Sequence, residues 1–186
     1  MSGLKRTVAL VGMMGAGKSS LGRRLAARLN VEFRDADTEI EHAAGCSINE
    51  IFARFGEPAF RDGERKVIAR LLGLAPHVLA TGGGAFADDT IRARIKSDAV
   101  SVWINVPLSV LVERVGRRDT RPMLKDGDPA EIMARLMKER EPLYAQADLT
   151  VESREVPHET IVDEIVAGLR GRLTPVAGRE TGAATS

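Results

Sequence analysis

Residues 12–19 read Gly-Met-Met-Gly-Ala-Gly-Lys-Ser and match the pattern G-x-x-x-x-G-K-[ST] at every fixed position. An apolar run, Thr7–Val11, leads into this stretch, and apolar residues at helical spacing follow it over Lys18–Leu29. Between a strand and a helix, such glycines let backbone N–H groups turn inward around a polyphosphate, and the helix N-terminus adds its partial positive charge. Lys18 can reach the β- and γ-phosphates, and the hydroxyl of Ser19 can ligate Mg²⁺. The stretch therefore predicts a site for a nucleoside triphosphate and leaves the second substrate open.

Outward from this loop, short β-rich runs alternate with longer helical patterns, which is typical of a parallel sheet with crossover helices. The expected strands are Thr7–Val11, Val31–Asp35, Val78–Thr81, Val100–Val106 and Leu149–Val151. The expected helices are Lys18–Leu29, Ile48–Phe55, Glu64–Leu72, Asp88–Ile95, Leu108–Val115, Pro129–Tyr144 and Pro157–Leu173, with Gly56 and Pro58 separating the second from the third. We therefore predict one α/β domain over residues 1–173 on a five-stranded parallel sheet, followed by a disordered tail, 174–186.

The composition excludes several classes of protein. With 186 residues, of which 44% are hydrophobic and 28% charged, the chain can bury one compact core. A net charge of +1 argues against a partner that is nucleic acid or an acidic membrane surface. No apolar run approaches the ~18 residues that a membrane-spanning helix needs. No signal-peptide pattern is visible and Cys46 is the single cysteine, so we expect a cytoplasmic protein without disulfides.

Arginine strongly outnumbers lysine, with 21 arginines against 6 lysines. A genome rich in G and C would produce this bias without any functional cause. The alternative is that some guanidinium groups hold phosphates or carboxylates through two parallel hydrogen bonds, which an ammonium group cannot do. Composition alone leaves both explanations open.

Two carboxylates, Asp35 and Asp37, follow the second expected strand. Because they are two residues apart, we expect both side chains on one face of an extended segment, at the sheet edge where ligands bind. Two such carboxylates repel each other unless a cation or a donor lies between them, and Mg²⁺ and a substrate hydroxyl are candidates. A solvated loop, or an N-cap for a helix that starts near Glu39, is the alternative.

An arginine and three consecutive glycines are the next candidates for substrate binding. Arg61 follows Phe60 near a helix start, and Glu64 lies three residues later, where it could orient the guanidinium. The run Gly82-Gly83-Gly84 follows the third strand, and three glycines cost more conformational entropy than a structural turn requires. We interpret that run as a place where backbone N–H groups approach a small polar ligand.

A polar loop, 117–128, separates two expected helices and has no pattern that faces a core. Several arginines flank it: Arg114, Arg117, Arg118, Arg121 and, on the following helix, Arg140. These arginines form either a solvated basic face or part of a lid that closes on transferring phosphates.

In this order along the chain, the motifs resemble those of the shikimate kinase family, which phosphorylates the 3-hydroxyl of shikimate from ATP. The resemblance covers about residues 8–173, and it includes Arg121-Pro122-Met123-Leu124 and Arg140-x-Pro142-Leu143-Tyr144. It implies a P-loop fold of the nucleoside-monophosphate-kinase type, a three-layer sandwich with substrate-binding helices at about 37–64 and a mobile lid at about 115–128. It also implies an ATP-dependent enzyme of chorismate and aromatic amino-acid biosynthesis, which we expect to be a monomer.

The resemblance implies roles for particular residues. Shikimate would be held by Asp37, Arg61, Gly82, Gly83, Gly84 and Arg140. ATP would be held by Gly15, Ala16, Gly17, Lys18, Ser19, Ser20, Arg114 and Arg121, with Arg114 beside adenine. Mg²⁺ would be bound by Ser19 and, through water, by Asp35, and the catalytic groups would be Lys18, Asp37 and Arg121. The last adenine contact falls around Arg154–Pro157, where the alignment is ambiguous.

Other functions share part of this pattern. A gluconate kinase would have the phosphate loop without the Asp-x-Asp, Phe-Arg-x-x-Glu and triple-glycine set. A nucleoside monophosphate kinase would need a pocket that recognises a second base, for which the sequence shows no motif. A nucleotide-binding module without activity would be expected to lack Asp37 or Arg121, and both are present.

Overall fold

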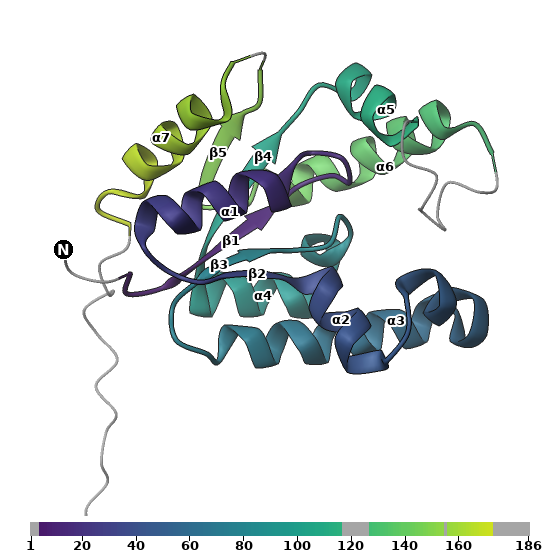
Figure 1. Ribbon diagram of the computed structural model, residues 1–186. Coiled ribbons are helices and arrows are strands. Elements are labelled where there is room, and N and C mark those ends of the chain that lie inside the picture. The colour runs from purple at the N-terminus through teal and green to yellow at the C-terminus, as the bar shows by residue number, and fades with distance from the viewer. Residues whose placement is uncertain (1–3, 117–126, 155, 173–186) are drawn as a thin grey trace, which may run out of the picture.

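Five parallel strands form the middle layer of the protein (Figure 1). The computed structural model describes residues 4–116, 127–154 and 156–172. The strands are β1 (Thr7–Val11), β2 (Phe33–Asp35), β3 (Val78–Ala80), β4 (Ala99–Asn105) and β5 (Leu149–Glu152), in the spatial order β2-β3-β1-β4-β5. All neighbouring pairs are parallel. This confirms the expected five-stranded sheet.

Helices cover both faces of the sheet. They are α1 (Lys18–Leu29), α2 (Ala36–Ala44), α3 (Ile48–Leu72), α4 (Asp89–Asp98), α5 (Leu108–Gly116), α6 (Pro129–Tyr144) and α7 (His158–Leu169), with a short 3₁₀ helix η1 (Ala85–Ala87). Helices α1 and α7 pack together on one face, and α3 packs beside α4 on the other (Figure 1). No helix within the described ranges is both long and apolar enough to span a bilayer.

The predicted break between two helices at Gly56 is confirmed as a kink within α3, and the helical part after it begins earlier than the predicted Glu64. Gly56 has φ 79°, a left-handed conformation, and the chain bends there. Pro58 follows in the first turn after the bend, where its missing N–H costs no helical hydrogen bond. The helix therefore resumes immediately and carries Arg61 and Glu64 on helical backbone.

The inner strands of the sheet, β1, β3 and β4, are buried, as in most parallel sheets, whereas the edge strand β2 is half-buried. Every residue of β1 is buried, and so are six of the seven residues of β4. The carboxyl ends of β1, β2 and β3 lie at one edge of the sheet, because parallel strands run in the same direction. That edge brings together the phosphate loop, Asp35 and the triple glycine, and ligands bind at such edges in open α/β sheets.

Candidate active site

The phosphate loop joins β1 to α1 and has the conformation that its glycines permit. Gly12, Gly15 and Gly17 have positive φ, which side-chain-bearing residues rarely adopt. Gly17 precedes α1 and, having no side chain, provides no side-chain cap for the first N–H groups of the helix. The ammonium of Lys18 donates to the carbonyl oxygens of Gly12, at 2.7 Å, and Met13, at 2.8 Å. The loop therefore has the tightly turned backbone that its sequence predicted.

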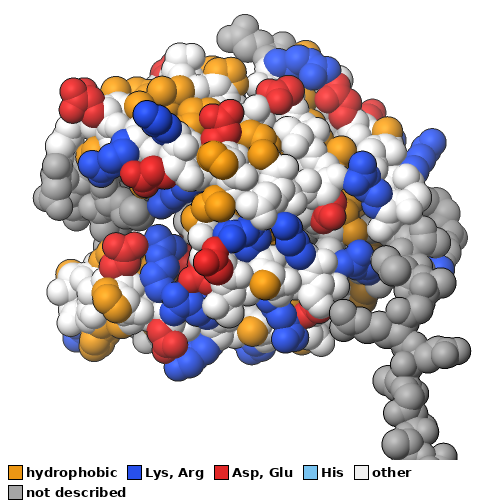
Figure 2. Space-filling view, turned by 180° about the vertical axis from the view of Figure 1, so that it is seen from behind, with side chains coloured by type: hydrophobic (Ala, Val, Ile, Leu, Met, Phe, Trp, Pro, Cys, Tyr) orange, Lys and Arg blue, Asp and Glu red, His pale blue; other side chains and the backbone are white. Residues whose placement is uncertain are grey.

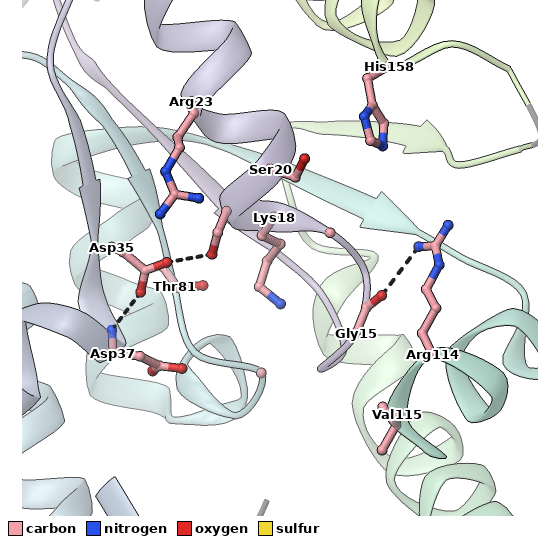
Figure 3. Close-up of a pocket in the computed structure, with 13 residues that line it drawn as sticks. Gly15, Lys18, Ser20, Arg23, Asp35, Asp37, Thr81, Arg114, Val115 and His158 are labelled. Carbon is pink, nitrogen blue, oxygen red and sulfur yellow. Dashed lines mark hydrogen bonds between the residues drawn. The ribbon is translucent and has the colours of Figure 1, made fainter. Parts of the chain in front are cut away.

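A cavity of about 590 Å³ opens beside this loop (Figure 3). Its lining comprises Gly15, Gly17, Lys18, Ser19, Ser20, Arg23, Asp35, Asp37, Thr81, Gly83, Arg114, Val115 and His158. We call it the phosphate cavity. Arg114 reaches it from α5 and donates to the carbonyl of Gly15 at 3.3 Å. Ala16 is buried and does not line the cavity, so a contact from this residue would come from its backbone.

Asp35 and Asp37 do not lie on one extended segment, and that prediction was wrong. Asp35 ends β2 and caps α2, where its Oδ1 accepts from the N–H groups of Asp37, at 3.1 Å, and Thr38, at 3.4 Å. Asp37 lies in the first turn of α2, which begins at Ala36, three residues before the start near Glu39 that the capping alternative gave. The capping interpretation is therefore confirmed for Asp35, and both carboxylates still line the phosphate cavity (Figure 3).

A hydroxyl and a carboxylate meet where a metal ion would be expected. The hydroxyl of Ser19 donates to Oδ2 of Asp35 at 2.5 Å. Hydroxyl and carboxylate oxygens suit Mg²⁺, which usually keeps several waters and binds through few protein ligands plus substrate phosphates. In the described part of the chain, no three His, Cys, Asp or Glu side chains gather as a metal-binding group. Ser19 and Asp35 therefore fit a magnesium ion that is shared with a nucleotide.

A second cavity, of about 400 Å³, adjoins the first. We call it the acceptor cavity, and its lining comprises Met14, Asp37, Thr38, Glu41, Ser47, Ile48, Asn49, Phe52, Phe60, Arg61, Glu64, Gly82, Gly83 and Gly84. Asp37 and Gly83 line both cavities. A molecule in the acceptor cavity would therefore lie next to a nucleotide's terminal phosphate, with the Asp37 carboxylate at the boundary.

Arg61 and Glu64 form a partly buried ion pair in the wall of the acceptor cavity. Nη1 of Arg61 lies 2.7 Å from Oε2 of Glu64, and its guanidinium carbon lies 5.1 Å from the ring centroid of Phe60. Glu64 is fully buried, and its Oε1 has no hydrogen-bond partner among the described residues. Burial raises the pKa of Glu64 above its ordinary value, and the charge of Arg61 acts in the opposite direction. Glu64 thus holds the guanidinium in place, as its spacing predicted.

The three glycines are needed because other parts of the protein approach them closely. A Cβ on Gly82 would lie 2.9 Å from both Asp37 Oδ1 and Glu64 Oε1. On Gly83 it would lie 2.9 Å from the backbone nitrogen of Met14, and on Gly84 2.7 Å from Nη2 of Arg61. The triple glycine therefore lets α2, α3 and the phosphate loop converge. Contact with a ligand through its N–H groups stays a prediction.

Arg140 lies behind the two cavities and lines neither. It is buried, and its Nη1 donates to the carbonyl of Gly83 at 3.2 Å. The hydroxyl of Tyr144 donates to the same carbonyl, and burial raises the pKa of Tyr144 to about 12. Arg140 thus contacts both cavities only through Gly83, which lines each of them. Arg121 and most of the expected lid, 117–126, lie outside the described residues.

Sequence reasoning missed four residues that line the phosphate cavity: Arg23, Thr81, Val115 and His158. Arg23 lies one helical turn after Ser19, a spacing that could have indicated a shared face. It also stacks on Phe33, with 5.1 Å between its guanidinium carbon and the ring centroid. No local pattern marks His158, which approaches the cavity only through the packing of α7.

Known proteins resemble this chain over most of its length. The family model described as shikimate kinase matches residues 14–170. The shikimate kinase of Paramagnetospirillum magneticum is 60% identical over 165 residues, which cover 88% of this chain and 84% of that protein. That of Nitrobacter winogradskyi is 59% identical over 168 residues, which cover 90% of this chain and 78% of that protein.

Comparison of this chain with solved structures distinguishes similarity to its family from similarity of fold alone. The shikimate kinase from Acinetobacter baumannii, solved in complex with shikimate, has a TM-score of 0.87 and 35% identity over 90% of this chain and 94% of that chain. A gluconokinase from Sinorhizobium meliloti has a TM-score of 0.59 and 18% identity over 92% of this chain and 95% of that chain. At that identity the second likeness concerns the fold alone.

Proposed function

The chain belongs to the shikimate kinase family, and we propose that its two adjoining cavities hold the two substrates of that reaction. The enzyme phosphorylates the 3-hydroxyl of shikimate and gives shikimate 3-phosphate. ATP, the donor, occupies the phosphate cavity and leaves as ADP, and shikimate occupies the acceptor cavity. The observation that carries this assignment is that Asp37 and Gly83 line both cavities, which supports a position of the acceptor hydroxyl beside the γ-phosphate.

On the donor side, the phosphate loop and Lys18 hold the phosphates. Lys18 exchanges its hydrogen bonds with the loop carbonyls for bonds to the β- and γ-phosphates. The N–H groups at the start of α1 hold the same phosphates from the other side. As charge develops on the transferring group, these donors stabilise it without reorganising. Arg121, which the family resemblance places over the phosphates, stays a prediction because it lies outside the described residues.

Ser19 and Asp35 hold the magnesium ion that accompanies ATP. Mg²⁺ neutralises charge on the phosphates. The Ser19 hydroxyl contributes an oxygen ligand, and Asp35 reaches the ion through water. The capping bonds from Asp37 and Thr38 to Oδ1 of Asp35 fix the orientation of its carboxylate, so Oδ2 stays directed at Ser19.

On the acceptor side, a carboxylate binds the hydroxyls of shikimate and arginines bind its carboxylate. Asp37 accepts hydrogen bonds from the hydroxyls of shikimate, orients the 3-hydroxyl for in-line attack on the γ-phosphorus, and takes its proton. Arg61, fixed by Glu64, binds the carboxylate of shikimate as a planar fork. Arg140 holds Gly83 at the boundary of the cavities and, although it lines neither cavity in this structure, reaches the same carboxylate when its guanidinium turns from the Gly83 carbonyl towards the acceptor cavity.

We further propose that the enzyme is one domain, acts as a monomer in the cytoplasm and binds neither nucleic acid nor membranes. Basic and acidic side chains are interspersed over the face seen from behind, which supports a surface without a strong field of one sign (Figure 2). Among the described residues, the exposed large hydrophobic side chains are Phe55 and Leu74. They lie at separate places in the chain and form no continuous apolar face of their own.

The test is ADP release by the purified protein with a panel of acceptors. With MgATP, we expect release that depends on shikimate, together with formation of shikimate 3-phosphate identified by mass spectrometry. Gluconate and nucleoside monophosphates should give no more ADP than the control without an acceptor. Release with gluconate in place of shikimate would overturn the proposal in favour of the alternative function.

A further inference from the structure

Two oxygen atoms in the wall of the acceptor cavity lack a hydrogen-bond partner within the described part of the chain. They are Oδ1 of Asn49 and Oε1 of Glu64, both buried, and both residues line the acceptor cavity. Buried acceptors in folded proteins are nearly always paired. Two unpaired acceptors beside one cavity therefore indicate a ligand that carries hydrogen-bond donors, such as hydroxyl groups.

We propose that the side-chain amide of Asn49 binds the 5-hydroxyl of shikimate and makes the enzyme selective for acceptors that carry this group. The inference rests on the proposed function, because it takes shikimate as the occupant of the acceptor cavity. Glu64 already has a role there, since its Oε2 holds the guanidinium of Arg61 at 2.7 Å. The amide of Asn49 has no such role.

The polar neighbours of Asn49 are engaged in holding the start of α3. Oε1 of Glu41 accepts from the backbone N–H of Ile48 at 2.9 Å, which ties α2 to α3. Ser47 and Glu50 form a reciprocal cap, in which the hydroxyl of Ser47 accepts from the N–H of Glu50 and the carboxylate of Glu50 accepts from the N–H of Ser47. These bonds fix the first turn of the helix, and they leave the amide oxygen of Asn49 to a ligand.

The amide reaches a ligand by turning about its terminal torsion. Its Oδ1 is buried, whereas Asn49 as a whole is half-buried and lines the cavity. The terminal torsion of Asn is broad, and no hydrogen bond from Oδ1 to the described residues opposes the turn. A hydroxyl both donates and accepts, so it pairs with either end of the amide.

The shape of shikimate assigns its 5-hydroxyl to this wall. Carbons 1, 3 and 5 alternate around its ring and carry the carboxylate, the hydroxyl that is phosphorylated and the 5-hydroxyl. With the carboxylate at Arg61 and the 3-hydroxyl at Asp37, the 5-hydroxyl points to a third part of the cavity wall. The start of α3, which contributes Ser47, Ile48 and Asn49 to the lining, is that part.

The experiment compares kcat/KM for shikimate and for 5-deoxyshikimate in wild type and Asn49→Ala. Loss of one neutral hydrogen bond should lower kcat/KM for shikimate about five- to tenfold. For 5-deoxyshikimate, which lacks the bonded hydroxyl, the two proteins should agree within about twofold. A merely structural role of Asn49 would lower both values equally. Arg54→Ala, an exposed change on the same helix, is the matched control and should alter neither value.

A second variant and a second analogue keep the test sharp. Asn49→Leu keeps most of the side-chain volume without the amide, so it should reproduce the pattern of Asn49→Ala. With 4-deoxyshikimate, which retains the 5-hydroxyl, Asn49→Ala should again lose about five- to tenfold.

Three results would each overturn the inference: an unchanged kcat/KM for shikimate in Asn49→Ala, an unchanged value in Asn49→Leu, or an equal loss for shikimate and 5-deoxyshikimate. Failure of the proposed function is a different result, in which the wild-type enzyme releases no ADP with shikimate.

Discussion

The two cavities share a boundary, yet the protein builds them in different ways. The phosphate cavity takes its central groups, the loop N–H donors, Lys18 and Ser19, from eight consecutive residues, 12–19. The acceptor cavity is assembled from α2, α3, the triple glycine and the loop residue Met14. Its charged groups are held by side chains from other elements, as Arg61 is by Glu64.

The two cavities differ in what must be positioned: backbone N–H groups in the phosphate cavity, and charged side chains in the acceptor cavity. Backbone conformation, allowed by glycines with positive φ, is enough to form a phosphate site. Recognition of the acceptor requires charged side chains from separate helices to come together. One of them, the carboxylate of Glu64, is buried, and removing it from water costs free energy. We therefore expect substitutions in the acceptor cavity to impair the use of shikimate while ADP binding survives.

The largest expected effect comes from Asp37→Asn. Asn cannot accept the proton of the attacking hydroxyl, so kcat should fall about 10²- to 10⁴-fold. The Kd for ADP should stay within about twofold, because the loop does not depend on this carboxylate. A coupled assay and calorimetry measure the two quantities, and Asp62→Asn, an exposed carboxylate on α3, is the control. Near-normal turnover would remove Asp37 from the catalytic groups.

Arg140→Lys is expected to have the next largest effect. A single ammonium can keep the bond to the Gly83 carbonyl, but it cannot hold a carboxylate through two parallel bonds. Loss of one charge-assisted contact predicts a rise of about 10- to 100-fold in the KM for shikimate, with little change for ATP. Steady-state kinetics check this, with the exposed Arg135→Lys on the same helix as the control. Unchanged kinetics would place Arg140 outside the acceptor site.

Two glycine substitutions test the boundary between the cavities. In Gly83→Ala the new methyl group would meet the backbone of Met14 at 2.9 Å, so the loop itself must shift. We expect about five- to tenfold weaker binding of both ADP and shikimate. In Gly84→Ala the close atom belongs to the flexible end of Arg61, so the KM for shikimate alone should rise. Equal effects of both variants on ADP binding would contradict this separation.

The smallest expected effect is a pH dependence of stability that comes from Glu64. Burial raises its pKa above the ordinary value of 4.5, so its contribution to stability is complete below that pH. The contribution is lost as the pH rises through the raised pKa of the folded protein. Glu64→Gln cannot titrate, so wild type should lose melting temperature relative to this variant as the pH rises above 4.5, by about 2–4 °C per kcal/mol.

Thermal denaturation over this pH series measures the difference between the two proteins. Glu57→Gln is the matched control, because Glu57 is the exposed carboxylate that contacts the same guanidinium. A difference between wild type and Glu64→Gln that stays constant with pH would show that the buried carboxyl does not titrate in this range.

Elements marked by strong local patterns could be predicted from the sequence. Helix α1 and helix α6 begin and end at the predicted residues, because apolar spacing and neighbouring glycine or proline residues mark them. Helix α2 was predicted only as an alternative, with a start near Glu39 instead of Ala36, because it is short and follows β2 with no connecting loop. The kink at Gly56 was predicted as a gap, since the sequence does not show that Pro58 would restart the helix.

By itself, the sequence determined the fold class, the phosphate loop and, through the order of its motifs, the family. These features depend on short-range patterns, namely glycines at set spacing and alternation of strands with helices. Tertiary structure alone decided that Asp37 lies on a helix at the boundary of two cavities, that Arg140 lies behind them, and that His158 reaches the nucleotide side. The physical reason is that such positions follow from how separate helices pack, and packing joins residues far apart in the chain without a local signal.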